Sequence, residues 1–178
     1  VAVEGGRIVD VSAHELPAQR VVDAAGLIVS PGFIDVHSHL DGHPYAGQLS
    51  VMQGITTTVG GNCGLSPLDF EEWFAGQERT GYVLNQAELV GHTFSLRKAV
   101  GLTDTGARAG AAQILAMARI AARALQAGAA GISLGLDYAP GASLAEIEAM
   151  AALAAEYGRN LPVHTRLFTQ NDLYSLYE

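Results

Sequence analysis

The stretch Gly32-Phe33-Ile34-Asp35-Val36-His37-Ser38-His39 decides the fold, because in it a short apolar run turns polar at its end. Four later stretches repeat this pattern, and each is a short β-rich run followed by glycine or polar residues. They are residues 55–59 running into 60–64, 87–90 into 91–93, 131–136 into 137–138, and 161–164 into 165–166. Runs of this length and composition predict short β-strands with reactive side chains at their carboxyl ends.

Helical patterns lie between these runs. They cover residues 46–52, 69–77 and 109–127, and a further helix begins at Ser143, with Glu146 at capping-box spacing, and ends near Tyr157. Strands that alternate with helices predict parallel βαβ units in an α/β fold. Because all five strands carry polar residues at their carboxyl ends, a (β/α)-barrel is favoured over a doubly wound sheet.

An eight-stranded barrel of this kind usually needs about 250 residues. Residues 31–178 have room for about five βα units, so the sequence predicts a partial (β/α)8 barrel of the TIM type. Residues 1–30 form a separate part, with a hairpin around Gly5-Gly6 and further short strands at 20–23 and 27–29.

Composition excludes several classes of function. The chain has 178 residues, 49% of them hydrophobic, and a formal net charge of −8 without a basic patch, so nucleic acid is not an expected partner. It has no apolar run long enough for a membrane-spanning helix, and no Walker loop, no dinucleotide fingerprint and no CxxC motif. The single cysteine, Cys63, cannot form an intramolecular disulfide, and a reducing cytoplasm is the simplest expected location.

The histidines and Cys63 are the residues most able to carry chemistry. His37 and His39, at i and i+2, point the same way on a strand and suit a metal, or are ordinary polar residues. Asp41 follows as a possible ligand, an orienting carboxylate or a helix cap. Cys63, in a glycine-rich turn, is a buried apolar residue, a nucleophile or a thiolate ligand.

Two further strand ends carry candidates of the same kind. His164 adds an imidazole at the end of the fifth predicted strand, and Arg166 is either a partner for a carboxylate or a surface ion-pair residue. His43 and His92 are expected to be hydrogen-bonded structural histidines.

Residues 27–39, Leu-Ile-Val-Ser-Pro-Gly-Phe-Ile-Asp-Val-His-Ser-His, resemble the opening of the amidohydrolase superfamily barrel. The runs 53–57 (Gln-Gly-Ile-Thr-Thr) and 61–67 (Gly-Asn-Cys-Gly-Leu-Ser-Pro) resemble its D-aminoacylase branch, the N-acyl-D-amino-acid deacylases. Residues 131–141 and His164-Thr165-Arg166 extend the resemblance, which covers most of residues 20–170.

The resemblance implies a small β-sandwich domain, represented here in part by residues 1–30, ahead of a metal-dependent hydrolase barrel in residues 31–178. It implies that His37, His39, Cys63 and His164 bind one or two zinc ions, with Cys63 in place of the carboxylated lysine of many relatives. The only lysine, Lys98, follows the third predicted strand, which agrees with that replacement. Tyr138 is implied as a substrate contact, and Arg166 is a candidate for holding a substrate carboxylate.

The implied activity is hydrolysis of an amide bond in a small molecule, the N-acyl-D-amino acid. The family's general-base aspartate is expected beyond residue 178, so no catalytic base is assigned within the chain. Two alternatives stay open at this point: a cyclic-amide hydrolase of the dihydroorotase or hydantoinase type, and a metal-binding fragment without turnover.

Overall fold

The computed structural model describes residues 1–40 and 42–166. They form two compact units, Val1–Gly32 and the part of the chain from Phe33 onward. None of the described helices combines the length and the apolar character that crossing a membrane would require.

The first unit contains a two-stranded antiparallel sheet of β1 (Ala2–Glu4) and β2 (Arg7–Asp10). Gly5 and Gly6 both have positive φ, the conformation that the tight turn requires, so the predicted hairpin is confirmed. The strands predicted at 20–23 and 27–29 are wrong, because no described segment pairs with them. Their apolar side chains remain exposed, and a run of apolar residues becomes a strand only when a neighbour satisfies its backbone.

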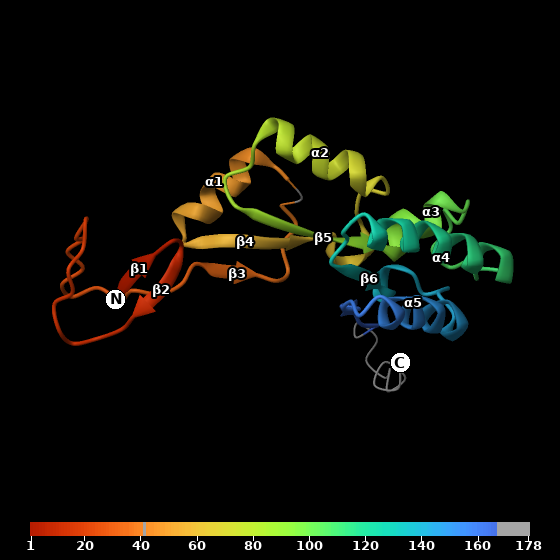
Figure 1. Cartoon of the computed structure of the whole chain (residues 1–178). Helices are drawn as coiled ribbons and strands as arrows, with labels where there is room; N and C mark the ends of the chain where they lie inside the picture. The colour runs from red at the N-terminus through yellow and green to blue at the C-terminus, as the bar shows by residue number, and fades with distance from the viewer. Residues whose placement is uncertain (41, 167–178) are drawn as a thin grey trace. The chain divides into compact units, whose positions relative to one another are not determined.

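The second unit is built on five parallel strands in the order β3-β4-β5-β6-β7 among the described residues (Figure 1). These strands are β3 (Phe33–Asp35), β4 (Ile55–Gly60), β5 (Asn85–Gly91), β6 (Gly131–Gly135) and β7 (Val163–His164). The order follows the sequence and never reverses, whereas a doubly wound sheet reverses at its switch point. The predicted partial (β/α)8 barrel is confirmed.

A helix or helical segment connects each strand to the next. α1 (Pro44–Met52) precedes β4 and α2 (Phe70–Thr80) precedes β5. Between β5 and β6 the chain forms a single π turn, η2 (His92–Leu96), the short α3 (Arg97–Ala99) and the long α4 (Ala111–Gln126). Two 3-10 turns, η1 (Asn62–Gly64) and η3 (Leu136–Tyr138), directly follow β4 and β6, and α5 (Leu144–Glu156) precedes β7.

The apolar core lies where α4 and α5 pack on β5 and β6. Met117, Ala121, Ala124 and Leu125 of α4 are buried, and their spacing places them on one face of the helix. Ile132 and Leu134 of β6 and Met150 of α5 are fully buried in the same cluster. This packing fixes β6, whose five residues are all buried, more firmly than the half-exposed β3.

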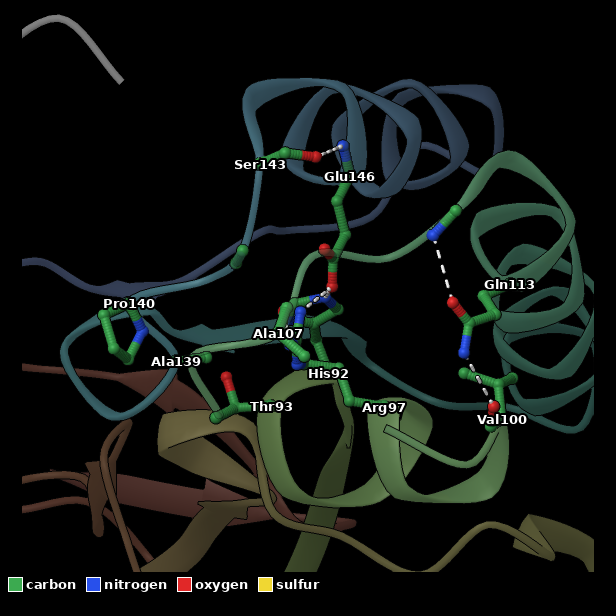
Figure 2. A network of polar contacts seen from close by, with 12 residues as sticks. His92, Thr93, Arg97, Val100, Ala107, Gln113, Ala139, Pro140, Ser143 and Glu146 are labelled. Carbon is green, nitrogen blue, oxygen red and sulfur yellow. Dashed lines mark hydrogen bonds and ion pairs between the residues drawn. The ribbon is translucent and has the colours of Figure 1, made fainter. Parts of the chain in front are cut away.

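A buried polar network crosses this core between η2, α3 and α5 (Figure 2). The carboxylate of Glu146 lies 2.5 Å from Nη1 of Arg97 and 2.8 Å from Nε2 of His92, and all three side chains are buried. Arg97 also donates from Nη2 to the carbonyl of Ala107 at 2.5 Å. The guanidinium thereby connects α3 to α5 and to the loop that precedes α4.

Glu146 does not complete the predicted capping box. The Ser143 hydroxyl does accept the backbone N–H of Glu146, which is one half of that motif. The Glu146 side chain instead turns inward to Arg97, because a buried guanidinium needs a countercharge. Burial alone would raise the pKa of Glu146, but hydrogen bonds and charge from His92 and Arg97 outweigh it and lower the pKa below its usual value.

This network makes stability depend on pH at the acid end. A lowered folded-state pKa means that Glu146 stabilises the fold above its unfolded-state pKa of about 4.3, and that the contribution is lost as pH falls through the lower folded-state value. In Glu146→Gln we expect a loss of about 3–5 kcal/mol at pH 7, since Arg97 keeps a buried charge without its partner. The remaining stability should fall less steeply below about pH 4.3 than that of the wild type.

The measurement is denaturant unfolding across pH, with Glu72→Gln as the matched control. Glu72 pairs with Arg79 at 2.6 Å, but both side chains are exposed, so that variant should lose less than about 1 kcal/mol. Equal losses in the two variants, or an unchanged acid slope in Glu146→Gln, would contradict the assignment.

Candidate metal centre

Four side chains of metal-binding type, three histidines and one cysteine, converge at the carboxyl ends of three strands. His37 and His39 follow β3, Cys63 lies in η1 directly after β4, and His164 is the last residue of β7. The Cys63 sulfur lies 3.5 Å from Nε2 of His37, 3.8 Å from Nε2 of His39 and 3.4 Å from Nδ1 of His164. Three imidazoles therefore surround one thiol, although they lie 26, 24 and 101 residues away from it in the chain.

The donor atoms have the spacing and the chemistry of a metal site. The ligand atoms of His37, His39 and Cys63 all lie within 4.8 Å of one another, and the two imidazole rings meet edge to face at 5.2 Å. Imidazole nitrogen and thiolate sulfur are the donors that zinc prefers. His164 contacts the same sulfur from the end of β7, so imidazoles approach the thiol both from the loop after β3 and from β7.

Accessibility suits an ion that must enter and exchange. His37 and His39 are exposed, and Cys63 and His164 are half-buried. Burial raises the pKa of the Cys63 thiol, because it removes water from around the thiolate. A bound metal ion acts in the opposite direction, since the thiolate is the form that coordinates it.

Cys63 has an unusual backbone conformation. Its φ of 56° makes it the only residue other than glycine with a positive φ among those described. The left-handed conformation costs a residue with a Cβ about 1–2 kcal/mol, and glycine avoids that cost. A cysteine at such a position indicates that its side chain is needed there, because strained residues concentrate at functional sites.

Close backbone contacts seat the η1 turn on β5 and β6. A methyl group added at Gly61 would lie 2.0 Å from the carbonyl oxygen of Leu89, and one added at Gly135 would lie 2.2 Å from that of Cys63. Neither position has room for a side chain. The turn is therefore held against two strands by direct backbone approach.

Asn62 joins two of the ligand-bearing loops, a role that was not predicted from the sequence. Its buried side-chain amide donates to the carbonyl of Val59 at 2.7 Å and to that of Ser38 at 3.4 Å. Ser38 lies between the two histidines of the first loop. In the sequence, only the position of an asparagine at the polar end of a predicted strand pointed to this role. Its partner Ser38 is 24 residues away and follows a different strand, so the contact could not be read from local sequence.

Tyr138 and Arg166 lie beside the same centre. The Tyr138 ring packs edge to face on His164 at 4.8 Å and also contacts Phe94 at 5.5 Å. Arg166 donates to the carbonyls of Pro140 at 3.2 Å and Ala142 at 2.7 Å, in the segment that follows Tyr138. The structure thus brings Tyr138 to the histidine cluster and connects Arg166 to the backbone next to it.

The remaining sequence candidates fall outside this cluster. His92 is buried against Glu146, as expected of a structural histidine. His43 is exposed at the start of α1, and its carbonyl accepts the backbone N–H of Gly47 at 3.0 Å. Asp41 lies outside the described residues.

The strain at Cys63 predicts different stabilities for two cysteine-free variants. Cys63→Ala and Cys63→Gly both remove the thiol, but only glycine removes the left-handed penalty. We expect the metal-free Cys63→Gly variant to be more stable than Cys63→Ala by about 1 kcal/mol, measured by denaturant unfolding with a chelator present. An alanine variant as stable as the glycine variant would show that position 63 is not held in the left-handed region.

Comparisons with known proteins agree with this geometry. Residues 20–164 match the model of the amidohydrolase family. An N-acyl-D-aspartate deacylase of Alcaligenes xylosoxydans xylosoxydans is 42% identical over 79% of this chain and 33% of its own length. An N-acyl-D-glutamate deacylase of the same organism is 38% identical over 93% of this chain and 39% of its own length. The chain thus spans between a third and two fifths of these curated relatives.

Solved structures show the same similarity. A crystal structure of D-aminoacylase superposes with a TM-score of 0.80 at 33% identity, over 90% of this chain and 40% of that one. An N-acyl-D-glutamate deacylase from Bordetella bronchiseptica, in complex with zinc and a phosphonate inhibitor, superposes with a TM-score of 0.75 at 39% identity, over 84% of this chain and 37% of that one. With its strand order, its histidine-surrounded cysteine and this match over most of its length, the chain belongs to the amidohydrolase family.

Proposed function

We propose that the protein is a zinc-dependent hydrolase that removes the acyl group from N-acyl-D-amino acids. The observation that carries the proposal is the convergence of three imidazoles on the Cys63 thiol at the carboxyl ends of β3, β4 and β7. That edge is where (β/α)-barrel enzymes place their active sites. The names of the relatives supply the substrate class, since they are deacylases of N-acyl-D-amino acids.

We assign the four side chains to two metal positions. Cys63 with His164 would hold one ion, and His37 with His39 would hold a second where two are present. Zinc bound in this way supplies Lewis-acid polarisation of the amide carbonyl and activates water near neutral pH. The chain's own contribution is to fix these ligands on rigid strand ends.

Substrate contacts are proposed on the side of His164. Tyr138 is 41% exposed and packs on the His164 ring, so its outer face can contact a bound acyl group or amino-acid side chain. Arg166 supports this wall, because its guanidinium holds the carbonyls of the segment after Tyr138. The prediction that Arg166 also binds the substrate carboxylate rests on the geometry of its planar donors and stays a prediction.

Metal content is the first test of this proposal. Protein purified without a metal-affinity tag should contain roughly one or two zinc ions per chain by elemental analysis. Cys63→Ala should lose most of that zinc, since the thiol is the donor that all three imidazoles surround. Full zinc content in Cys63→Ala would contradict the ligand assignment.

A substrate panel tests the activity separately. The N-acetyl derivatives of D-aspartate, D-glutamate and D-leucine, each with its L enantiomer, should give release of the free amino acid from the D series only. Dihydroorotate and hydantoin serve as the cyclic-amide control. Ring opening of these compounds without deacylation, or turnover confined to the L series, would overturn the proposed substrate class.

A further inference from the structure

The η1 turn must be held in place if the strained Cys63 is to direct its sulfur at three imidazoles. Its neighbours Gly61 and Gly64 also have positive φ, so three of these four consecutive residues occupy a region that most side chains avoid. η1 itself is only three residues long, and the backbone N–H of Leu65 reaches the carbonyl of Asn62 over a long 3.4 Å. Its geometry therefore depends on groups supplied from elsewhere in the chain.

A single hydroxyl from β6 makes two hydrogen bonds to the turn. Ser133 Oγ accepts the backbone N–H of Gly64 at 3.0 Å and donates to the carbonyl of Gly61 through a short hydrogen bond. One side chain thus binds the backbone on both sides of Cys63, from a residue 69 positions later in the chain. Ser133 is 1% exposed, so water does not compete for either bond.

Ser133 itself is rigidly placed. It is the middle residue of β6, every residue of which is buried, and it is paired in register with Gly91 of β5. Two residues on, Gly135 allows the backbone of β6 to approach the Cys63 carbonyl. The strand therefore contacts the turn at Gly61, Cys63 and Gly64, and the Ser133 hydroxyl makes the hydrogen bonds to Gly61 and Gly64.

We propose that Ser133 is a positioning residue for the Cys63 thiolate, which it directs toward the metal by holding Gly61 and Gly64. This inference rests on the metal site of the proposed function and is independent of the substrate. Side chains that orient a ligand from outside the coordination shell typically change metal affinity 10–100-fold when removed. A loss of this size is expected from Ser133→Ala.

Ser95 offers a matched control. Its hydroxyl also accepts a backbone N–H and donates to a carbonyl, in this case both of Ser66, at 2.8 Å and 2.7 Å. Like Ser133 it is buried, and Ser95→Ala deletes the same atoms. Its two bonds hold a residue beyond the turn, whereas those of Ser133 flank the cysteine.

The test uses Co²⁺ as a spectroscopic substitute for zinc. Affinity is measured by competition with a chelator, the thiolate-to-cobalt charge-transfer band reports whether sulfur is coordinated, and denaturant unfolding of the metal-free proteins reports structural damage. We expect both alanine variants to lose metal-free stability, but only Ser133→Ala to bind Co²⁺ about 10–100-fold more weakly, with a weakened charge-transfer band. Ser133→Thr, which keeps the hydroxyl, should recover most of the affinity.

Each result decides a separate point. Wild-type affinity in a folded Ser133→Ala, equal losses of affinity in the two alanine variants, or a threonine variant as weak as alanine would each overturn the positioning role. If metal-free Ser133→Ala does not fold, the dependence of its folding on Co²⁺ concentration gives the same affinity by linkage. Absence of Co²⁺ binding in the wild-type protein would overturn the metal site itself.

Discussion

The cluster of three imidazoles around Cys63 depends on how closely the turn after β4 can approach the backbones of β5 and β6. Gly61 and Gly135 leave no space for a side chain, and it is this contact that carries the Cys63 sulfur to the strand ends where the histidines lie. A single methyl group at either glycine would clash with a backbone carbonyl, so the turn or the neighbouring strand would have to move. The parallel order of the sheet brings the ligands to one edge, but the absence of two side chains brings them within reach of one another.

The polar residues buried in the core have a different role from the histidines and cysteine at the carboxyl ends of the strands. Glu146, Arg97 and His92 are enclosed by the core and connect helical segments to one another, so their removal is expected to affect stability. His37 and His39 are exposed, Cys63 is half-buried, and their ligand atoms lie within 4.8 Å of one another. The chain thus carries two histidine-containing clusters, one enclosed and structural, the other open at the strand ends.

The barrel part of the fold could be predicted from sequence because each of its strands is a short β-rich run bounded by glycine or polar residues. The strands expected at 20–23 and 27–29 do not form. The sequence shows their apolar character but not whether another strand pairs with them, and that pairing decides whether a strand forms. Glu146 had the spacing of a cap, but its true partner, Arg97, lies 49 residues away. Ser133 lies within an apolar run. Nothing in the neighbouring sequence shows that its hydroxyl binds the backbone of another loop.

The order of the strands has a consequence for how the protein is made. β3 to β7 pair in the order in which they are synthesised, so each strand can dock on its predecessor as the chain emerges. The thiol and its most distant imidazole are 101 residues apart, and they meet only after the last of these strands has docked. A metal held by both would close that long loop as a crosslink does, so loading of the site would follow the docking of β7 on β6 during biosynthesis.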